Sequence, residues 1–415
     1  MKKIFGRLKT RILLLLSIVG PGIIAANADN DAGGITTYSV AGAHYGTSLL
    51  WVLFLITFSL AVTQEMGVRI GLVTRQGLAG LIRENFRVKW TAFVMVLMLI
   101  ANVGTIAAEF AGVAASLSMI GINKYLAVTF AAITVWFILY KGSFKTTQKI
   151  FLLFSAFYIV YIINGFIVGP DFGAAIKDMV TPQISLETGF LIMMIALIGT
   201  TITPWGQFFI QSYVVDKGLN VKDYHAERGE VYLGAFMTNI VSFFIIISTT
   251  ATLFAHGIQI HDAKDAAIAL RPLAGDMAQI LFAFGLFSAS MLGAFILPTA
   301  TSYAICEAFG WESGFDTTWK NGKIFYGIIL GSIIIPALIV LLPGISLIKI
   351  MIISQDINGI LLPFILIFVM LLINNKKIMG EYTNRPIGNV IAWTTIAGII
   401  GITCVMVATS IMGLN

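Results

Sequence analysis

Long apolar runs separated by short polar segments make up nearly all of this chain. Each run is about as long as a helix must be to cross the hydrocarbon core of a bilayer, roughly 18–20 residues. The pattern therefore predicts about eleven membrane-spanning helices. Their expected bounds are roughly 12–42, 48–73, 90–120, 123–140, 148–169, 188–214, 230–255, 274–309, 323–342, 346–374 and 387–412.

The composition supports an all-α polytopic membrane protein. Of the 415 residues, 58% are hydrophobic and only 11% are charged, whereas soluble domains carry about a quarter charged residues. The net charge of +6 is scattered through short loops, so no nucleic-acid partner is expected. Cys306 and Cys404 make neither a disulfide framework nor a metal site. We expect multi-pass insertion in a cytoplasmic membrane of bacterial type, with the lipid bilayer as the surroundings, and the sequence leaves protein partners unknown.

The basic residues predict the orientation of the chain. If the N-terminus is cytoplasmic, all but five of the 26 Lys and Arg residues fall on the cytoplasmic side. The positive-inside rule therefore places the N-terminus inside and the C-terminus outside. The first apolar run follows a basic segment and is too long for a signal peptide, so it is expected to be a retained span.

Two of the predicted spans contain polar interruptions. Residues 27–34 read NADNDAGG within the run that begins near Ile12, and residues 200–206 read TTITPWG within the run that begins near Leu191. A lipid-facing helix cannot carry carboxylates and freed backbone groups at its midpoint. Broken helices that line a cavity and bind ions at their ends are the usual solution in secondary transporters.

The spacing of the two interruptions predicts an internal repeat. They fall in the first and sixth spans, and an offset of five spans inverts the second set relative to the first. Inverted five-helix repeats with broken helices 1 and 6 are typical of the LeuT-type architecture. We expect one transmembrane domain over 1–415, with repeats over about 12–169 and 188–374 and an extra helix over about 387–412.

Asp31 is the first candidate for binding a cation. A carboxylate near the middle of a membrane costs at least ~2.5–3.5 kcal/mol, so a cation, a partner or water normally compensates it. Gly33 and Gly34 are expected to let the backbone leave the helix and turn carbonyls toward a ligand. Asp31 could instead cap the second half-helix. Asp29 and Asn30 are as suited to fixing the unwound segment as to touching the ion.

The second interruption offers hydroxyl and carbonyl oxygens. Thr200, Thr201 and Thr203 precede Pro204, whose ring blocks a helical hydrogen bond and frees carbonyls. Threonines in membrane helices usually bond back to their own helix, which is the alternative here. A site made of carboxylate, hydroxyl and carbonyl oxygens suits Mg²⁺, Ca²⁺ or Mn²⁺ over softer metals.

Other intramembrane polar residues are candidates for lining the cavity or bridging helices. Trp205 is most simply a packing residue, although next to the break it could form a cavity wall. The remaining members of this wider set are Gln207, Glu109, Asn239, Gln355 and Asp356.

Several motifs resemble the Nramp family of divalent-metal transporters over nearly the whole chain. Residues 20–22 (GPG) with 31–34 (DAGG) are similar to the family's first helix, where the motif usually reads Asp-Pro-Gly-Asn. Residues 202–205 (ITPW) lie where the family has Ile-Met-Pro-His. Residues 107–109 (AAE), 354–355 (SQ) and 362–364 (LPF) resemble its third and tenth spans. The resemblance implies that Asp31, Gly34, Thr200 and Thr203 stand at the metal-binding positions.

This chain departs from the family pattern at those positions. Asp31 retains the metal-binding aspartate, but Gly34 replaces an asparagine and Thr203 replaces the methionine whose thioether favours transition metals. Departures also fall on the family's proton path, where Ile106 replaces an aspartate. Along the same path Trp205 and Gln211 replace two histidines, and Leu330 lies close to the place of an arginine. This pattern resembles the Nramp-related magnesium transporters, which are thought to bind the ion with much of its water.

We therefore expect a Mg²⁺ uptake transporter that works by alternating access, carries Mn²⁺ as well, and is not coupled to protons. No cofactor is expected, since the metal is the transported substrate. The first alternative is a proton-coupled Mn²⁺ or Fe²⁺ transporter of the main Nramp family. The second is a sodium-coupled carrier of an organic solute on the same architecture. An enzyme is not expected, because no nucleophile–base pair is present in the spans.

Overall fold

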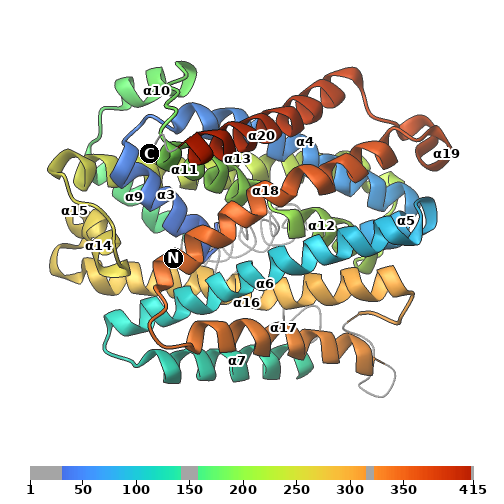
Figure 1. Cartoon of the computed structure of the whole chain (residues 1–415), viewed down its shortest axis with the longest axis horizontal. Coiled ribbons are helices and arrows are strands. Elements are labelled where there is room, and N and C mark those ends of the chain that lie inside the picture. Colours follow the sequence, from blue (N-terminus) through green and yellow to red (C-terminus); the bar gives the residue numbers. More distant parts are fainter. Residues whose placement is uncertain (1–29, 142–157, 315–321, 413–415) are drawn as a thin grey trace, which may run out of the picture.

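The computed structural model describes residues 30–141, 158–314 and 322–412, and this part of the chain is helical with no strand. The longer helices pack side by side as a bundle (Figure 1). Their bounds are α3 (Ala32–Tyr45), α4 (Leu50–Thr74), α6 (Val88–Met119), α7 (Lys124–Lys141), α9 (Ile159–Val168), α11 (Thr188–Thr201), α12 (Pro204–Asp216), α13 (Tyr224–Thr252), α16 (Ala278–Phe309), α17 (Lys323–Leu341), α18 (Leu347–Ile373) and α20 (Pro386–Met412).

Short helices lie at the two ends of the bundle. Helices α5 (Leu78–Asn85) and α19 (Lys376–Met379) lie at one end, which the charge pattern predicts to be cytoplasmic (Figure 1). Helices α10 (Phe172–Val180), α14 (Ala263–Ala267) and α15 (Arg271–Ala274) lie at the opposite end. The bundle therefore has two distinct ends, which match the two sides of a membrane.

Most of the predicted spans are present as helices. Within the described residues, nine helices are long and apolar enough to cross a membrane when α11 and α12 are counted together. A tenth span would require α9 and α10 to act as one, although the chain bends by 116° between them. The predicted first and fifth spans lie partly outside the described residues, so the expected count of about eleven remains a prediction.

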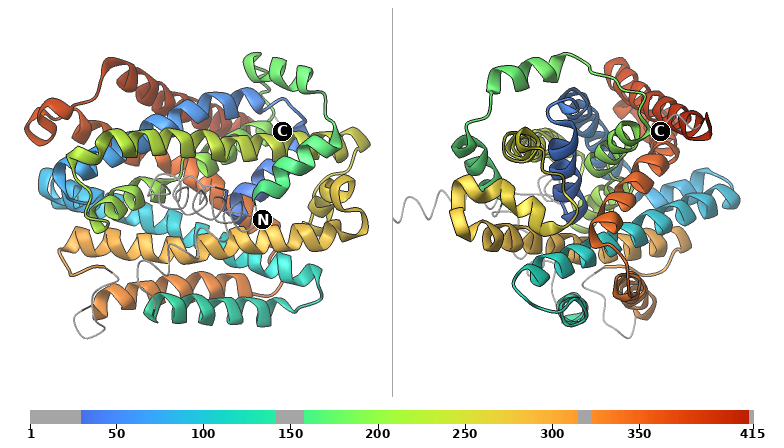
Figure 2. Two further views of the ribbon diagram at one scale, coloured as in Figure 1. Left: turned by 180° about the vertical axis from the view of Figure 1, so that it is seen from behind. Right: turned by 60° about the vertical axis from the view of Figure 1, so that its left-hand side comes forward.

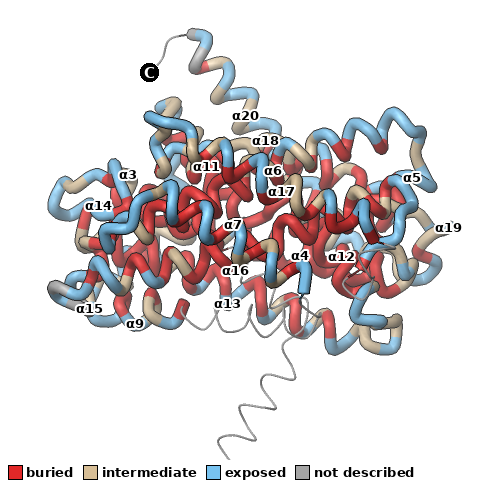
Figure 3. The backbone as a smooth tube through the Cα atoms, turned by 90° about the horizontal axis from the view of Figure 1, so that it is seen from below, coloured by how far each residue is buried: buried red, intermediate tan, exposed pale blue. Residues whose placement is uncertain are grey.

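The core of the bundle lies where α3, α6, α11, α16 and α18 meet. Helices α4 and α13 pack against this core, and α7 and α17 form an outer layer beside α6 and α16 (Figures 1 and 2). Buried residues fill the middle of the molecule, whereas the ends and the outer helices are exposed (Figure 3). The exposed outer side chains are themselves apolar, for example Leu126 and Phe130 of α7. An apolar outer surface is what a bilayer requires of the helices that face it.

One predicted interruption coincides with a break between two helices, and the other coincides with the start of a helix. Helix α11 ends at Thr201 and α12 begins at Pro204, so Ile202 and Thr203 form the break. Proline at the first helical position is favourable, because its missing N–H would have no helical partner there. In the first interruption, α3 begins at Ala32 immediately after Asp31, and the preceding half of the predicted span lies outside the described residues.

Candidate functional site

Asp31 is the N-cap of α3 and is almost completely buried. Its Oδ1 accepts a hydrogen bond of 2.7 Å from the N–H of Gly34. None of the described residues donates a hydrogen bond to its Oδ2. The capping role considered from the sequence is therefore present, and it leaves one carboxylate oxygen available for a cation.

Gly33 and Gly34 do not let the chain leave the helix, and that expectation is wrong. Both residues lie in the first turn of α3, which begins at Ala32. A Cβ on Gly33 would lie 1.8 Å from Nε2 of Gln355 on α18. The first glycine is thus needed for close approach of two helices, while the N–H of Gly34 fixes the Asp31 carboxylate.

Glu109 of α6 brings a second carboxyl group to the start of α3. The side chains of Asp31 and Glu109 are close enough to interact electrostatically. Glu109 Oε2 also accepts a 3.3 Å hydrogen bond from the N–H of Ala32, and Glu109 packs directly on Gly293 of α16. Two carboxyl groups in contact repel each other when both are ionised, so this pair must share either a proton or a cation.

Asn30 fixes the segment before α3 to neighbouring helices. Its Nδ2 donates to Oγ1 and to the carbonyl of Thr238, and its Oδ1 accepts from Ser242, both on α13. The hydroxyl of Tyr158 donates to its backbone carbonyl at 2.8 Å. Of the two roles considered for Asn30, the structure places its amide in the anchoring one. Asp29 lies outside the described residues.

The second break presents threonines in two different situations. Thr201 Oγ1 bonds back to the carbonyl of Leu197 at 2.8 Å and also contacts the hydroxyl of Tyr38 on α3 at 2.9 Å. Thr200 Oγ1 is buried and has no hydrogen-bond partner among the described residues. Thr203 is the N-cap of α12, and its Oγ1 accepts from the N–H of Gly206 at 3.3 Å. Thr200 is therefore the hydroxyl left available for a ligand.

Gln355 connects the two breaks. Its side chain lies against Gly33 of α3, and its backbone carbonyl would be 2.2 Å from a Cβ on Gly199 of α11. Gly199 directly precedes Thr200, and Gly33 follows Asp31 by two residues. One residue of α18 thus separates the start of α3 from the end of α11, which brings the two candidate ligand positions into one buried region.

A chain of hydrogen bonds holds Gln355 in place. Its Oε1 accepts from Asn358 at 3.0 Å, and Asn358 in turn bonds to Thr105 of α6. The sequence did not indicate this network, because Asn358 and Thr105 are common helix-bridging residues with no distinguishing pattern. The position of Asn358 one helical turn after Gln355 was the only available signal.

The remaining residues of the wider candidate set are mostly buried. Trp205, Gln207 and Asn239 each keep at least one polar atom without a hydrogen-bond partner in the described part of the chain. Asp356 is only half-buried, and it follows Gln355 on a different face of α18. Trp205 packs on Phe209 with ring centroids 5.9 Å apart, which fits the packing role considered for it.

The donor set available at the breaks consists of oxygen atoms. Among the described residues, no group of three or more His, Cys, Asp and Glu side chains is arranged to hold a metal. A cation here would meet the Asp31 carboxylate together with hydroxyl, amide and carbonyl oxygens, with the Glu109 carboxyl group beside them. The sulfur of Met351 on α18 accepts a 3.4 Å hydrogen bond from Thr36, one turn beyond Gly33 on α3.

The sequence of residues 22–409 matches the family described as "Natural resistance-associated macrophage protein-like" (Nramp). The chain belongs to the Nramp family. It is 25% identical over 409 residues to the "Divalent metal cation transporter MntH" of Burkholderia ambifaria, covering 96% of this chain and 90% of that protein. It is 26% identical over 396 residues to the protein of the same name from Deinococcus radiodurans, covering 91% and 86%.

Solved structures confirm the predicted architecture. The manganese transporter of Eremococcus coleocola superposes with a TM-score of 0.74 at 19% identity, covering 95% of this chain and 86% of that chain. MhsT, solved in complex with L-phenylalanine, superposes with a TM-score of 0.62 at 15% identity, covering 93% and 97%. This Nramp protein therefore has the LeuT-type fold and is a multi-pass membrane protein.

Proposed function

We propose that this Nramp protein is a divalent metal cation transporter that carries Mg²⁺, and also Mn²⁺, into the cell by alternating access. The observation that carries the proposal is the donor set at the two helix breaks. Asp31 Oδ2 and Thr200 Oγ1 are both buried without hydrogen-bond partners in the described residues. Unpartnered oxygens at the ends of broken helices are suited to a cation that is bound for part of a cycle.

Membership of the family supports a divalent cation as the substrate. The relatives from Burkholderia ambifaria and Deinococcus radiodurans are both named as divalent metal cation transporters. Transport rather than catalysis is the function that this family and this fold favour. The site also contains the acidic residues that an organic anion would avoid, which disfavours a sodium-coupled carrier of an organic acid.

The chemistry of the donors supports Mg²⁺ in particular. Thr203 supplies a hydroxyl where family members commonly carry a thioether, and it already caps α12 through Gly206. Mg²⁺ prefers oxygen ligands, keeps several of its waters and gains little from a sulfur ligand. Smaller side chains at Gly34 and Thr203 are consistent with an ion that enters with part of its hydration shell.

The absence of proton coupling is supported by the residues around Glu109. Ile106, one turn earlier on α6, is apolar and fully buried, and Leu330 of α17 is apolar as well. Trp205 and Gln211 cannot relay protons as histidines do. Without a relay, inward movement of the cation would be driven by the membrane potential, worth about 2.3 kcal/mol per charge per 100 mV.

One observation favours proton-coupled Mn²⁺ transport as the second candidate. The proximity of Asp31 and Glu109 gives the site a carboxyl pair that can hold a proton and release it when a metal binds. The Eremococcus coleocola relative in fold is named as a manganese transporter. The two candidates differ in whether this proton crosses the membrane with the metal.

Transport assays in liposomes separate the candidates. Uptake of Mg²⁺, Mn²⁺, Ca²⁺ and Cd²⁺ would be measured with the potential clamped by potassium and valinomycin, while a trapped dye reports internal pH. We expect potential-dependent Mg²⁺ uptake without acidification of the lumen. Protein-dependent acidification that follows metal entry would establish the proton-coupled candidate. Uptake of amino acids in place of metals would contradict both candidates and indicate a carrier of organic solutes.

A further inference from the structure

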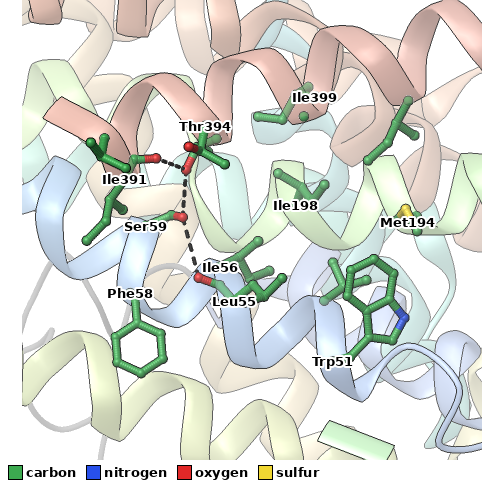
Figure 4. Close-up of a pocket in the computed structure, with 15 residues that line it drawn as sticks. Trp51, Leu55, Ile56, Phe58, Ser59, Met194, Ile198, Ile391, Thr394 and Ile399 are labelled. Carbon is green, nitrogen blue, oxygen red and sulfur yellow. Dashed lines mark hydrogen bonds between the residues drawn. The ribbon is translucent and has the colours of Figure 1, made fainter. Parts of the chain in front are cut away.

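A cavity of about 570 Å³ lies between α4, α11 and α20 (Figure 4). Its walls are almost entirely apolar. Trp51 and Leu55 line it from α4, Met194 and Ile198 from α11, and Gly398 from α20. Leu55 is 53% exposed, so the cavity opens onto the outer surface of the bundle, where the bilayer lies.

The seam between α4 and α20 continues beyond this cavity toward the predicted cytoplasmic end. Ser59 of α4 and Thr395 of α20 are hydrogen-bonded at 2.7 Å, which fixes the two helices side by side. Further along the same seam, Val62 of α4 and Gly388 of α20 line a second pocket of about 190 Å³. The apolar cavity and this second pocket are thus two parts of one surface between the same two helices.

The second pocket carries a net positive charge. Glu65 and Arg69 lie 3.1 Å apart and neutralise each other, and Glu65 also accepts a hydrogen bond from Tyr224. Arg228 and Arg385 line the same pocket. Neither forms an ion pair with a carboxylate of the described residues, so two guanidinium groups remain to bind an anion.

The two arginines are placed to bind a phosphate group. The guanidinium of Arg228 lies over the ring of Tyr232 at 5.2 Å, a contact that orients it beside the pocket. Arg385 is exposed at the start of α20. Arginine binds phosphate oxygens in a bidentate manner, and pairs of basic residues at the cytoplasmic surface attract anionic lipids.

The dimensions of the seam match one leaflet. From Gly388, beside the basic pocket, to Gly398 in the apolar cavity is ten residues, or about 15 Å of helix. The hydrocarbon core of a bilayer is about 30 Å thick, so one leaflet measures about half of that. A headgroup held by the arginines would therefore place an acyl chain along the seam and into the apolar cavity.

We propose that the α4–α20 seam binds one anionic glycerophospholipid, with its phosphate on Arg228 and Arg385 and an acyl chain in the cavity lined by Leu55, Ile198 and Gly398. Charge complementarity selects the anionic headgroup, and the placement of the apolar cavity and the basic pocket along the same two helices selects a lipid over a soluble anion. A zwitterionic lipid would leave the two arginines without a net negative partner.

The test is native mass spectrometry of the full-length protein in detergent, titrated with phosphatidylglycerol or phosphatidylcholine. We expect the parent protein to retain phosphatidylglycerol preferentially. Arg228→Gln and Arg385→Gln should each weaken its binding about fivefold, and Gly398→Leu should weaken both lipids by filling the cavity. A Cβ on Gly398 meets no atom within 4 Å, so this variant is compatible with folding.

Two matched variants control for general effects. Arg87→Gln removes an exposed arginine from the same predicted side, and Gly401→Leu adds the same side chain to α20 outside the lined cavity. Both should bind phosphatidylglycerol as the parent does. Equal retention of the two lipids by the parent, or equal losses in the control variants, would overturn the proposal. Competition by soluble glycerol 3-phosphate at the same concentration as the lipid would instead indicate a headgroup site without an acyl chain, and would also overturn it.

Discussion

Gln355 occupies the space that any side chain at Gly33 would need, since a Cβ there would lie 1.8 Å from Gln355 Nε2. The contact joins the first turn of α3, next to Asp31, to the middle of α18. On its other side, the carbonyl of Gln355 presses against Gly199 of α11. The two helix breaks are therefore held at a fixed separation by one residue, and changes in this packing should affect both.

Replacing Gly199 with alanine tests how tightly the breaks are packed. Its new Cβ would lie 2.2 Å from the carbonyl oxygen of Gln355, and a backbone atom cannot move aside as a side chain does. We expect a loss of about 1–3 kcal/mol in stability, typical of overpacking, measured as a lower unfolding temperature in detergent. Gly331→Ala on α17 is the control, because its Cβ would meet nothing within 4 Å. Equal stability of the two variants would mean that α11 and α18 separate easily.

Replacing Asp31 with asparagine separates its charge from its capping role. Asparagine caps helices about as well as aspartate, so α3 should keep its start while the site loses a negative charge. We expect Mg²⁺ flux in liposomes to fall about tenfold or more, in line with the losses seen when metal sites are altered. Asp171→Asn is the matched control, since Asp171 caps α10 in the same way outside the site. Normal flux in a monodisperse Asp31→Asn preparation would remove Asp31 from the site.

Replacing Thr200 with alanine should weaken metal binding without disturbing the fold. Its hydroxyl has no hydrogen-bond partner among the described residues, so its removal leaves no other group unsatisfied. We expect a higher KM for Mg²⁺ and an unchanged unfolding temperature. Thr201→Ala provides the contrast, because it removes the 2.9 Å contact with Tyr38 and should lower stability instead. A parent-like KM in Thr200→Ala would show that this hydroxyl does not face the ion.

Replacing Thr203 with methionine should change the preference among metals. A thioether is a poor ligand for Mg²⁺ and a good one for Cd²⁺ or Mn²⁺, so competition of Cd²⁺ against Mg²⁺ uptake should increase. The substitution also removes the cap on the N–H of Gly206. Thr203→Ser keeps that cap and should behave as the parent does. If selectivity is unchanged while transport is intact, Thr203 does not contact the ion.

Replacing Glu109 with glutamine tests the proposed lack of proton coupling. Glutamine retains an acceptor for the N–H of Ala32, which Glu109 Oε2 receives at 3.3 Å, and it resembles the protonated acid. If no proton is carried with the metal, Mg²⁺ uptake should persist and its dependence on external pH should stay the same. A strong loss of uptake together with a flattened pH profile would support the proton-coupled candidate.

The sequence by itself determined where most of the helices of this protein lie. Hydropathy located the long helices, because a span must be apolar over its whole length whatever it packs against. The polar interruptions located the start of α3 and the break between α11 and α12, and Pro204 marked the start of α12 to the residue. The sequence misjudged Gly33 and Gly34, whose function depends on a neighbouring helix rather than on their own backbone.

Only the tertiary structure decided which polar groups meet. Nothing in the sequence places Glu109 against Asp31, 78 positions earlier, or Gln355 between Gly33 and Gly199. The separate roles of Thr200 and Thr201 depend on which side of α11 faces Tyr38. Hydropathy reports how well a segment tolerates lipid, and it carries no information about the pairing of helices. That pairing is set by close packing of small residues and by buried hydrogen bonds between segments far apart in the chain.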